Sequence, residues 1–219
     1  MTLLEFARGP ALQIAFAVFA FGVLWRLASL LLLRRAVEWT RPRTGAPSTL
    51  VAVLRGELRH LWPGPAYRRG TLLVSVNSYV FHLGLLVIVL GLAQHILVLQ
   101  GLFGISWPNL PSGIVFAVAI VTLASLLAML ARRLTSPVLR LISNLDDYAS
   151  WLLTALPVAT GILATSHLGA RYETLLAIHI LSVAALLIWL PFGKLMHGGL
   201  LLITRGRTAA FYARRGAAS

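Results

Sequence analysis

The sequence predicts an all-α integral membrane protein, a five-helix bundle with its N-terminus outside the cell and its C-terminus in the cytoplasm. Hydrophobic residues make up 58% of the 219 residues, charged residues only 11%, and the mean hydropathy is +0.85, values far from those of soluble domains. A spanning helix needs roughly 20 mostly apolar residues, so the chain, a single domain over residues 1–219, accommodates five. We expect these spans at residues 11–33, 72–99, 113–130, 149–165 and 174–202. The first is too long for a signal peptide and should be retained.

The positions of the positive charges predict the orientation. The formal net charge is +13, yet residues 100–112 carry no charge at all. The positive-inside rule therefore places the basic segments on the cytoplasmic side of the cell's inner membrane. Topology and anionic lipid headgroups explain this basic surface, with a cytoplasmic partner as a second possibility, and nucleic acid is not expected as a partner. The basic residues are Arg34, Arg35, Arg41, Arg43, Arg55, Arg59, Arg68 and Arg69 before the second span, Arg132, Arg133 and Arg140 after the third, and Lys194, Arg205, Arg207, Arg214 and Arg215 near the C-terminus.

The longest connector, residues 34–70, contains one amphipathic segment. Residues 48–61 begin with a serine that can cap a helix and place leucines along one side. Such a helix suits the membrane surface or a docking partner, and a solvated connector is an equally good interpretation.

Four of the six histidines lie within the apolar stretches or at their ends. His82 and His95 belong to the second stretch, and His179 and His197 to the fifth. The chain has no cysteine, which excludes disulfides, thiolate-bound iron–sulfur clusters and covalently attached c-type haem. Imidazoles at membrane depth are then the candidate ligands of a redox metal or haem, although any one of them could instead bond to a neighbouring helix.

The expected topology pairs these histidines by depth. His179 and His197 are 18 residues apart, five turns or about 27 Å along one helical face, subject to a kink at Pro191. His82 should then lie level with His197 near the cytoplasm, and His95 level with His179 near the outer face. On a straight helix, however, His82 and His95 point roughly 140° apart. Either a local rewinding corrects this phase, or His167 in the outer loop replaces His95 as the fourth ligand.

Three stretches of the chain resemble the gamma subunit of respiratory nitrate reductase and related membrane cytochromes b, including heterodisulfide reductase-type ones. They are FHLG at residues 81–84, RRLTSP at 132–137 and LPFGKLMH at 190–197. The resemblance implies a five-helix subunit with two b-type haems that takes electrons from quinol near the outer face. It passes them to an iron–sulfur subunit and a catalytic oxidoreductase subunit in the cytoplasm. It further implies that His82 and His197 hold the inner haem and that His179 holds the outer one.

The chain departs from this family pattern at two places. The family has its fourth histidine where this chain has Leu92, so either His95 holds the outer haem or only the inner haem is present. No lysine stands at the outer end of the third span, where the nitrate reductase subunit has one at its quinol site. A quinone site would have to use other outer-face groups, and the candidates are Gln94, Gln100, His95, His167 and Trp107.

Two other classes of function remain open. The same histidines could form a proton or small-solute pathway, or the chain could be a structural membrane anchor for a soluble enzyme. The sequence offers no set of residues for bond-making chemistry, so we expect any role in an oxidoreductase complex to be electron transfer, with quinol oxidation as a possible addition.

Overall fold

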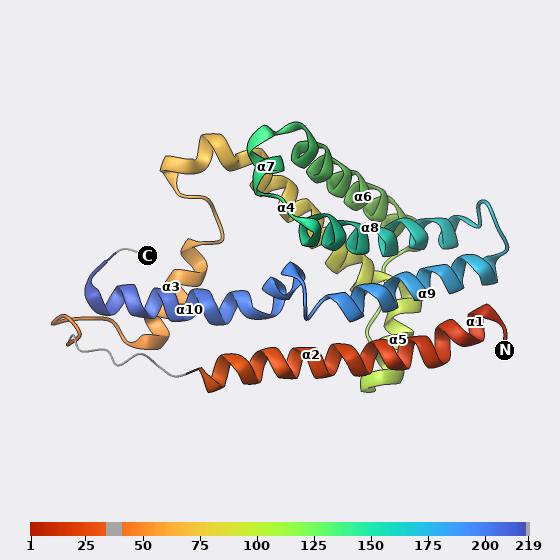
Figure 1. Ribbon diagram of the computed structural model, residues 1–219, viewed down its shortest axis with the longest axis horizontal. Coiled ribbons are helices and arrows are strands. Elements are labelled where there is room, and N and C mark those ends of the chain that lie inside the picture. Colours follow the sequence, from red (N-terminus) through yellow and green to blue (C-terminus); the bar gives the residue numbers. More distant parts are fainter. Residues whose placement is uncertain (34–40, 218–219) are drawn as a thin grey trace.

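The computed structural model describes residues 1–33 and 41–217, and every regular element within these ranges is a helix. Five helices of the described chain are long and apolar enough to cross a membrane (Figure 1). The predicted all-α membrane bundle is therefore confirmed, and the protein is a multi-pass membrane protein. The five are Leu3–Leu32, α4 (Pro65–Gly91), α6 (Ser112–Thr135), α8 (Leu145–Ser166) and α9 (Tyr172–Trp189).

The first of these helices is continuous but not uniform. It consists of α1 (Leu3–Phe6), one wide π-helical turn η1 (Ala7–Ala11) and α2 (Leu12–Leu32). The wide turn contains Pro10, whose missing N–H interrupts the regular hydrogen-bond ladder. The span thus begins earlier than the expected residue 11.

The remaining helices are shorter and connect or flank the spans. They are α3 (Thr49–Arg59), α5 (Ala93–Phe103), α7 (Pro137–Ile142), the 3₁₀ turn η2 (Lys194–Met196) and α10 (His197–Arg215). Together with the start of α4, the elements α3, α7 and α10 lie at one end of the bundle, on the left of Figure 1. We call this the basic end because most of the arginines predicted to share one membrane side lie there; Arg34 and Arg35 fall outside the described residues.

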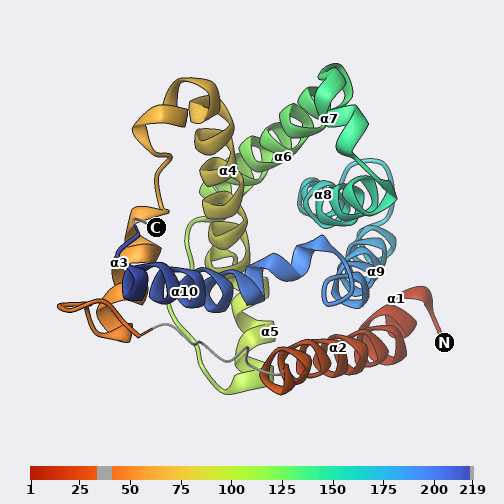
Figure 2. The same ribbon diagram turned by 60° about the vertical axis from the view of Figure 1, so that its left-hand side comes forward.

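The spans pack in the order α4, α6, α8, α9 and α2, which leaves α4 and α9 facing each other across the bundle (Figure 2). Small residues allow the close approaches. A β-carbon on Gly84 of α4 would lie 2.1 Å from the buried Thr122 hydroxyl oxygen of α6. Phe81, Leu126, Ala155 and Val158 form a small apolar core between α4, α6 and α8. Many other apolar side chains point outward, as expected for helices whose solvent is lipid.

The second expected span, residues 72–99, is broken, so its prediction as one helix was wrong. Leu92 has an extended backbone (φ −80°, ψ 128°) between α4 and α5. In a continuous helix the carbonyls of Leu90 and Gly91 would accept from amides further along the same helix. Here they accept instead from the Trp107 indole N–H at 2.7 Å and the Leu110 amide at 2.9 Å. The loop before α6 therefore caps the end of α4 in place of a further helical turn.

The fifth expected span, residues 174–202, is likewise two helices rather than one. Helix α9 ends at Trp189, because Pro191 has no N–H with which to continue the ladder. The chain then turns through η2, and His197 is the first residue of α10. The assumption of an unbroken 18-residue step from His179 to His197 along one helical face was wrong for this reason.

Helix α3 confirms the predicted amphipathic helix, with Ser48 as its N-cap. Its small residues pack on α10: a β-carbon on Gly56 would lie 2.3 Å from the β-carbon of Ala209. Its leucines face away from α10, and Leu50 and Leu58 are each 69% exposed. The segment is thus a docked helix with an uncovered apolar side, and not merely a solvated connector.

Candidate functional site

The four predicted histidines meet in two pairs. The ring centres of His82 and His197 lie 6.2 Å apart, with the ring planes nearly perpendicular at 87°. Those of His95 and His179 lie 6.1 Å apart, with the planes at 23°. These are the pairs expected from their depth in the membrane, one joining α4 to α10 and the other joining α5 to α9.

The broken helices produce this pairing. The extended residue Leu92 redirects the chain, so that His95 need not keep the helical phase of His82 and its ring reaches His179. The break after α9 sets His197 at the start of a new helix, where its ring reaches His82. The phase difficulty seen in the sequence applies only to a straight helix.

The rings of His82 and His197 are each held through Nδ1. His82 Nδ1 lies 2.7 Å from the Ser78 carbonyl oxygen, and His197 Nδ1 lies 2.9 Å from the Lys194 carbonyl oxygen. Because a carbonyl only accepts, we infer that each Nδ1 carries the proton. In a neutral imidazole this leaves Nε2 with a free lone pair, the arrangement found in metal-ligating histidines.

The rings of His95 and His179 are held in the same way by different groups. His95 Nδ1 lies 2.9 Å from the Ile88 carbonyl oxygen, seven residues earlier, across the helix break. His179 Nδ1 lies 3.2 Å from the Thr160 hydroxyl oxygen. That hydroxyl directs its own proton to the Leu156 carbonyl at 2.7 Å, so its oxygen accepts from His179. All four candidate rings therefore have Nδ1 engaged.

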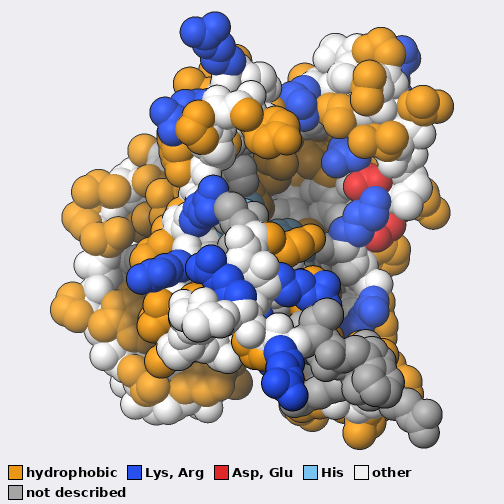
Figure 3. All heavy atoms as spheres, turned by 90° about the vertical axis from the view of Figure 1, so that its left-hand side faces the viewer, with side chains coloured by type: hydrophobic (Ala, Val, Ile, Leu, Met, Phe, Trp, Pro, Cys, Tyr) orange, Lys and Arg blue, Asp and Glu red, His pale blue; other side chains and the backbone are white. Residues whose placement is uncertain are grey.

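The space around the rings differs between the pairs. His82 and His197 are exposed, whereas His95 and His179 are half-buried. Figure 3 shows a hollow in the face that contains the basic end, with histidine surface visible inside it. At the second pair, Gly161 of α8 makes room for His179, since a β-carbon on Gly161 would lie 3.2 Å from Cε1 of the ring.

Each histidine pair suits a metal whose other ligands come from a cofactor. Among residues 1–33 and 41–217, no group of three or more histidine, aspartate or glutamate side chains could hold a bare ion. Two imidazoles do not complete a structural metal site, which needs about four protein ligands. A haem iron requires only axial ligands from the protein. Metal–nitrogen bonds of about 2 Å to each imidazole would set the ring centres about 6 Å apart, close to the 6.2 and 6.1 Å observed here.

The other two histidines lie apart from these pairs. His60 caps the end of α3 with Nδ1 2.7 Å from the Gly56 carbonyl oxygen, and its side chain is exposed. His167 ends α8 in a left-handed conformation (φ 56°) and stacks on Tyr172 with ring centres 5.0 Å apart. His167 is exposed as well. His95, not the reserve residue His167, is the histidine that contacts His179.

Comparison with known proteins shows a relative that is similar along nearly the whole chain. A protein of Nitratidesulfovibrio vulgaris (strain Hildenborough) is 31% identical over 220 residues, covering 98% of this chain and 96% of its own length. The chain belongs to the family of this protein. The match extends across all five apolar helices, and the relative's name, "Protein", indicates no activity. No protein-family model and no solved structure matches the chain.

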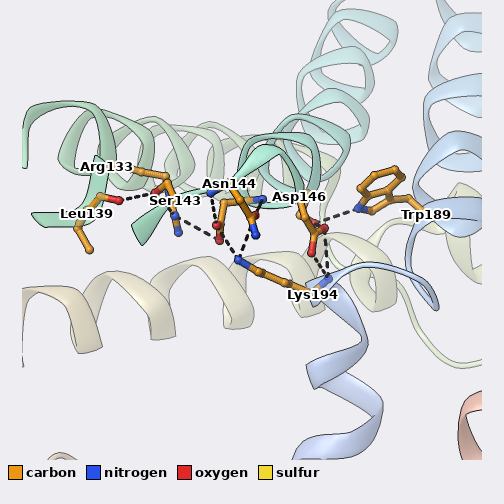
Figure 4. Close-up of polar contacts among 9 residues, drawn as sticks. Arg133, Leu139, Ser143, Asn144, Asp146, Trp189 and Lys194 are labelled. Carbon is orange, nitrogen blue, oxygen red and sulfur yellow. Dashed lines mark hydrogen bonds and ion pairs between the residues drawn. The ribbon is translucent and has the colours of Figure 1, made fainter. Parts of the chain in front are cut away.

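In this member of the family, a polar network at the start of α8 holds the turn that carries His197 (Figure 4). Asp146 accepts the backbone N–H of Lys194 at 3.2 Å, and Asp147 accepts the Lys194 ammonium at 2.6 Å. Lys194 in turn supplies the carbonyl that binds His197 Nδ1. The two aspartates therefore position His197 through Lys194.

The sequence predicted part of this network and missed its centre. Two acidic residues at the start of the fourth span, just after a group of arginines, predict that Asp146 and Asp147 cap that helix or pair with those arginines. Both occur at Asp147, which forms a capping box with Asn144 and an ion pair with Arg133 at 3.2 Å. Lys194 is some 47 residues further along the chain, and no local pattern links it to Asp147.

Arg26 supports the same region from the first span. Its guanidinium donates to the carbonyls of Pro191 and Phe192 at 3.0 and 3.3 Å, where the break after α9 leaves them without helical partners. An arginine in the inner half of the first apolar stretch predicts lipid headgroups or a haem propionate as its partner. The structure instead assigns Arg26 to the broken end of α9, which explains an arginine at this depth.

Proposed function

We propose that the protein is a membrane cytochrome b subunit of a respiratory redox complex. In this proposal His82 and His197 bind one haem b, and His95 and His179 bind a second. The observation that carries it is the occurrence of two imidazole pairs, each with ring centres about 6 Å apart and with every Nδ1 bonded to a group other than the paired histidine. The resemblance to the nitrate reductase gamma subunit supports His82, His197 and His179, and the contact with His179 adds His95.

His82 with His197, and His95 with His179, would hold the two haems b, and each haem would supply reversible one-electron transfer. The protein's residues orient the rings. The carbonyls of Ser78, Lys194 and Ile88 and the hydroxyl of Thr160 fix the four imidazole tautomers, so that Nε2 of each neutral ring keeps a lone pair for a metal.

We further propose that the basic end faces the cytoplasm of a bacterial cell and that the N-terminus lies outside, as the positive-inside rule indicates. Electrons would then pass between a quinol or quinone at the outer face and a cytoplasmic iron–sulfur subunit with its catalytic partner. Of the outer candidates, Trp107 is already engaged with Leu90, whereas Gln94 and Gln100 are exposed and available to a quinone.

The decisive experiment measures haem content. The full-length protein is purified from a haem-replete membrane and titrated by its reduced-minus-oxidised spectrum and by pyridine haemochrome. We expect two haems b per chain. His95→Ala and His82→Ala should each lower the ratio to one, while the matched controls His167→Ala and His60→Ala should keep it at two.

Two results would overturn the proposal. A protein without a b-type band would leave the proton-pathway or anchor interpretation. A loss of haem in His167→Ala but not in His95→Ala would show that the second haem is held elsewhere. Subunits that co-purify with the protein would identify the electron partner.

A further inference from the structure

A cavity of about 550 Å³ lies at the basic end, between α3, the loop before it and the end of α10. Three arginines line it: Arg43 from the loop, and Arg55 and Arg59 from α3. Figure 3 shows lysine and arginine side chains gathered over this face. The cavity is separate from the histidine pairs, so a ligand could bind in it whether or not the protein holds haem.

The backbone brings the three arginines to one place. Arg55 and Arg59 are four residues apart on α3 and so share a helical face. Arg43 is tied to α10, because its amide donates to the Arg214 carbonyl at 2.9 Å. Its side chain also packs over Gly216, where a β-carbon would lie 2.9 Å from Arg43 Cδ. Gly216 has a φ of +76°, which glycine adopts readily.

The described residues do not neutralise these charges. None of the ion pairs that they form involves Arg43, Arg55 or Arg59. The acidic residue of α3, Glu57, points toward α10, with Oε1 near Gly206 and without a hydrogen-bond partner. Three guanidinium groups around one cavity repel one another. An anion that accepts hydrogen bonds from several of them relieves that repulsion. Guanidinium forks suit phosphate oxygens in particular.

The apolar side of α3 indicates which phosphate is bound. Leu54 and Leu58 lie next to the arginine face of the helix and are 54% and 69% exposed. A helix with an apolar side beside a basic side lies in the headgroup region of a bilayer. A ligand that uses both sides has a phosphate and hydrocarbon chains.

We propose that this cavity binds the phosphate of an anionic phospholipid, whose acyl chains run along the leucines of α3. Basic pockets between helices at the cytoplasmic side of a membrane favour such headgroups. The bound lipid holds α3, which carries Arg55 and Arg59, and the end of α10 at the bilayer surface.

The test uses the full-length protein in detergent, with lipid binding measured by native mass spectrometry. The probes are phosphatidylglycerol, phosphatidylcholine and inorganic phosphate. We expect phosphatidylglycerol to bind in preference to the other two. Arg55→Gln/Arg59→Gln should weaken it at least about tenfold, since each charge-assisted hydrogen bond contributes about a factor of ten or more.

Two further variants make the result specific. Arg68→Gln/Arg69→Gln removes the same charge from exposed arginines outside the cavity and should leave binding unchanged. Leu54→Ser/Leu58→Ser should weaken the binding of phosphatidylglycerol. Equal loss in the two arginine pairs, or equal binding of phosphatidylcholine, would overturn the proposal. Inorganic phosphate that displaces the lipid at matched concentration would show a free-phosphate site instead.

Discussion

Asp147→Asn tests whether the network at the start of α8 holds the turn before His197. Asp147 is 11% exposed and contacts two cations, Lys194 at 2.6 Å (48% exposed) and Arg133 at 3.2 Å (31% exposed). Breaking a buried ion pair costs about 3–5 kcal/mol, and an exposed pair contributes less than about 1 kcal/mol. Asp147 is nearly buried and its two partners are partly exposed, so we expect the substitution to lower the free energy of unfolding by about 2 kcal/mol. An asparagine at position 147 can still accept a hydrogen bond from the backbone N–H of Asn144, so the helix cap remains.

The measurement is the apparent Tm in detergent, followed by tryptophan fluorescence, because Trp189 lies within the same network. About 2 kcal/mol corresponds to a fall of roughly 4–8 °C for a chain of this size. The matched control is Glu173→Gln, because Glu173 pairs with Arg171 at 3.7 Å and both side chains are exposed. It should change stability by less than about 1 kcal/mol. Equal Tm values for Asp147→Asn and the wild type would refute the reasoning, as would an equal fall in both variants.

Two other substitutions test the packing and the break of α4. Gly84→Ala places a methyl group 2.1 Å from the Thr122 hydroxyl oxygen and should destabilise by about 2 kcal/mol, whereas Gly101→Ala, with nothing within 4 Å, should be neutral or slightly stabilising in a thermal melt. An unchanged Tm for Gly84→Ala would contradict the close contact of α4 with α6. Trp107→Phe removes the donor to the Leu90 carbonyl and should cost about 1 kcal/mol. Faster amide hydrogen exchange at the end of α4 would accompany it, and wild-type exchange there would show that the indole does not cap the helix.

The five apolar helices could be predicted from composition alone because lipid imposes a simple rule. Every backbone polar group at membrane depth needs a partner, so an apolar run of sufficient length is helical. Local chemistry also predicted the amphipathic helix α3, since Ser48 caps it. These are properties of neighbouring residues, and the sequence displays them directly.

The two helix breaks could not be placed in the same way, because residues from other segments stabilise them. The freed carbonyls are bound by Trp107 and Arg26, which are distant in sequence from the groups they bond. No residue near either break points to these partners. Lys194 was missed for the same reason, since its aspartates belong to another span.

The breaks also explain why both histidine pairs have the same construction. In each pair one ring comes from an uninterrupted span, His82 in α4 or His179 in α9, and the other follows a break, His197 after α9 or His95 after α4. The second ring therefore does not depend on the helical phase of the first histidine in its own stretch. Two straight helices with the spacing of this chain could align only one pair. Two broken helices align both pairs. The spacing of His82 and His95, which is out of phase on a straight helix, is compatible with the second pair because the helix breaks at Leu92 between them.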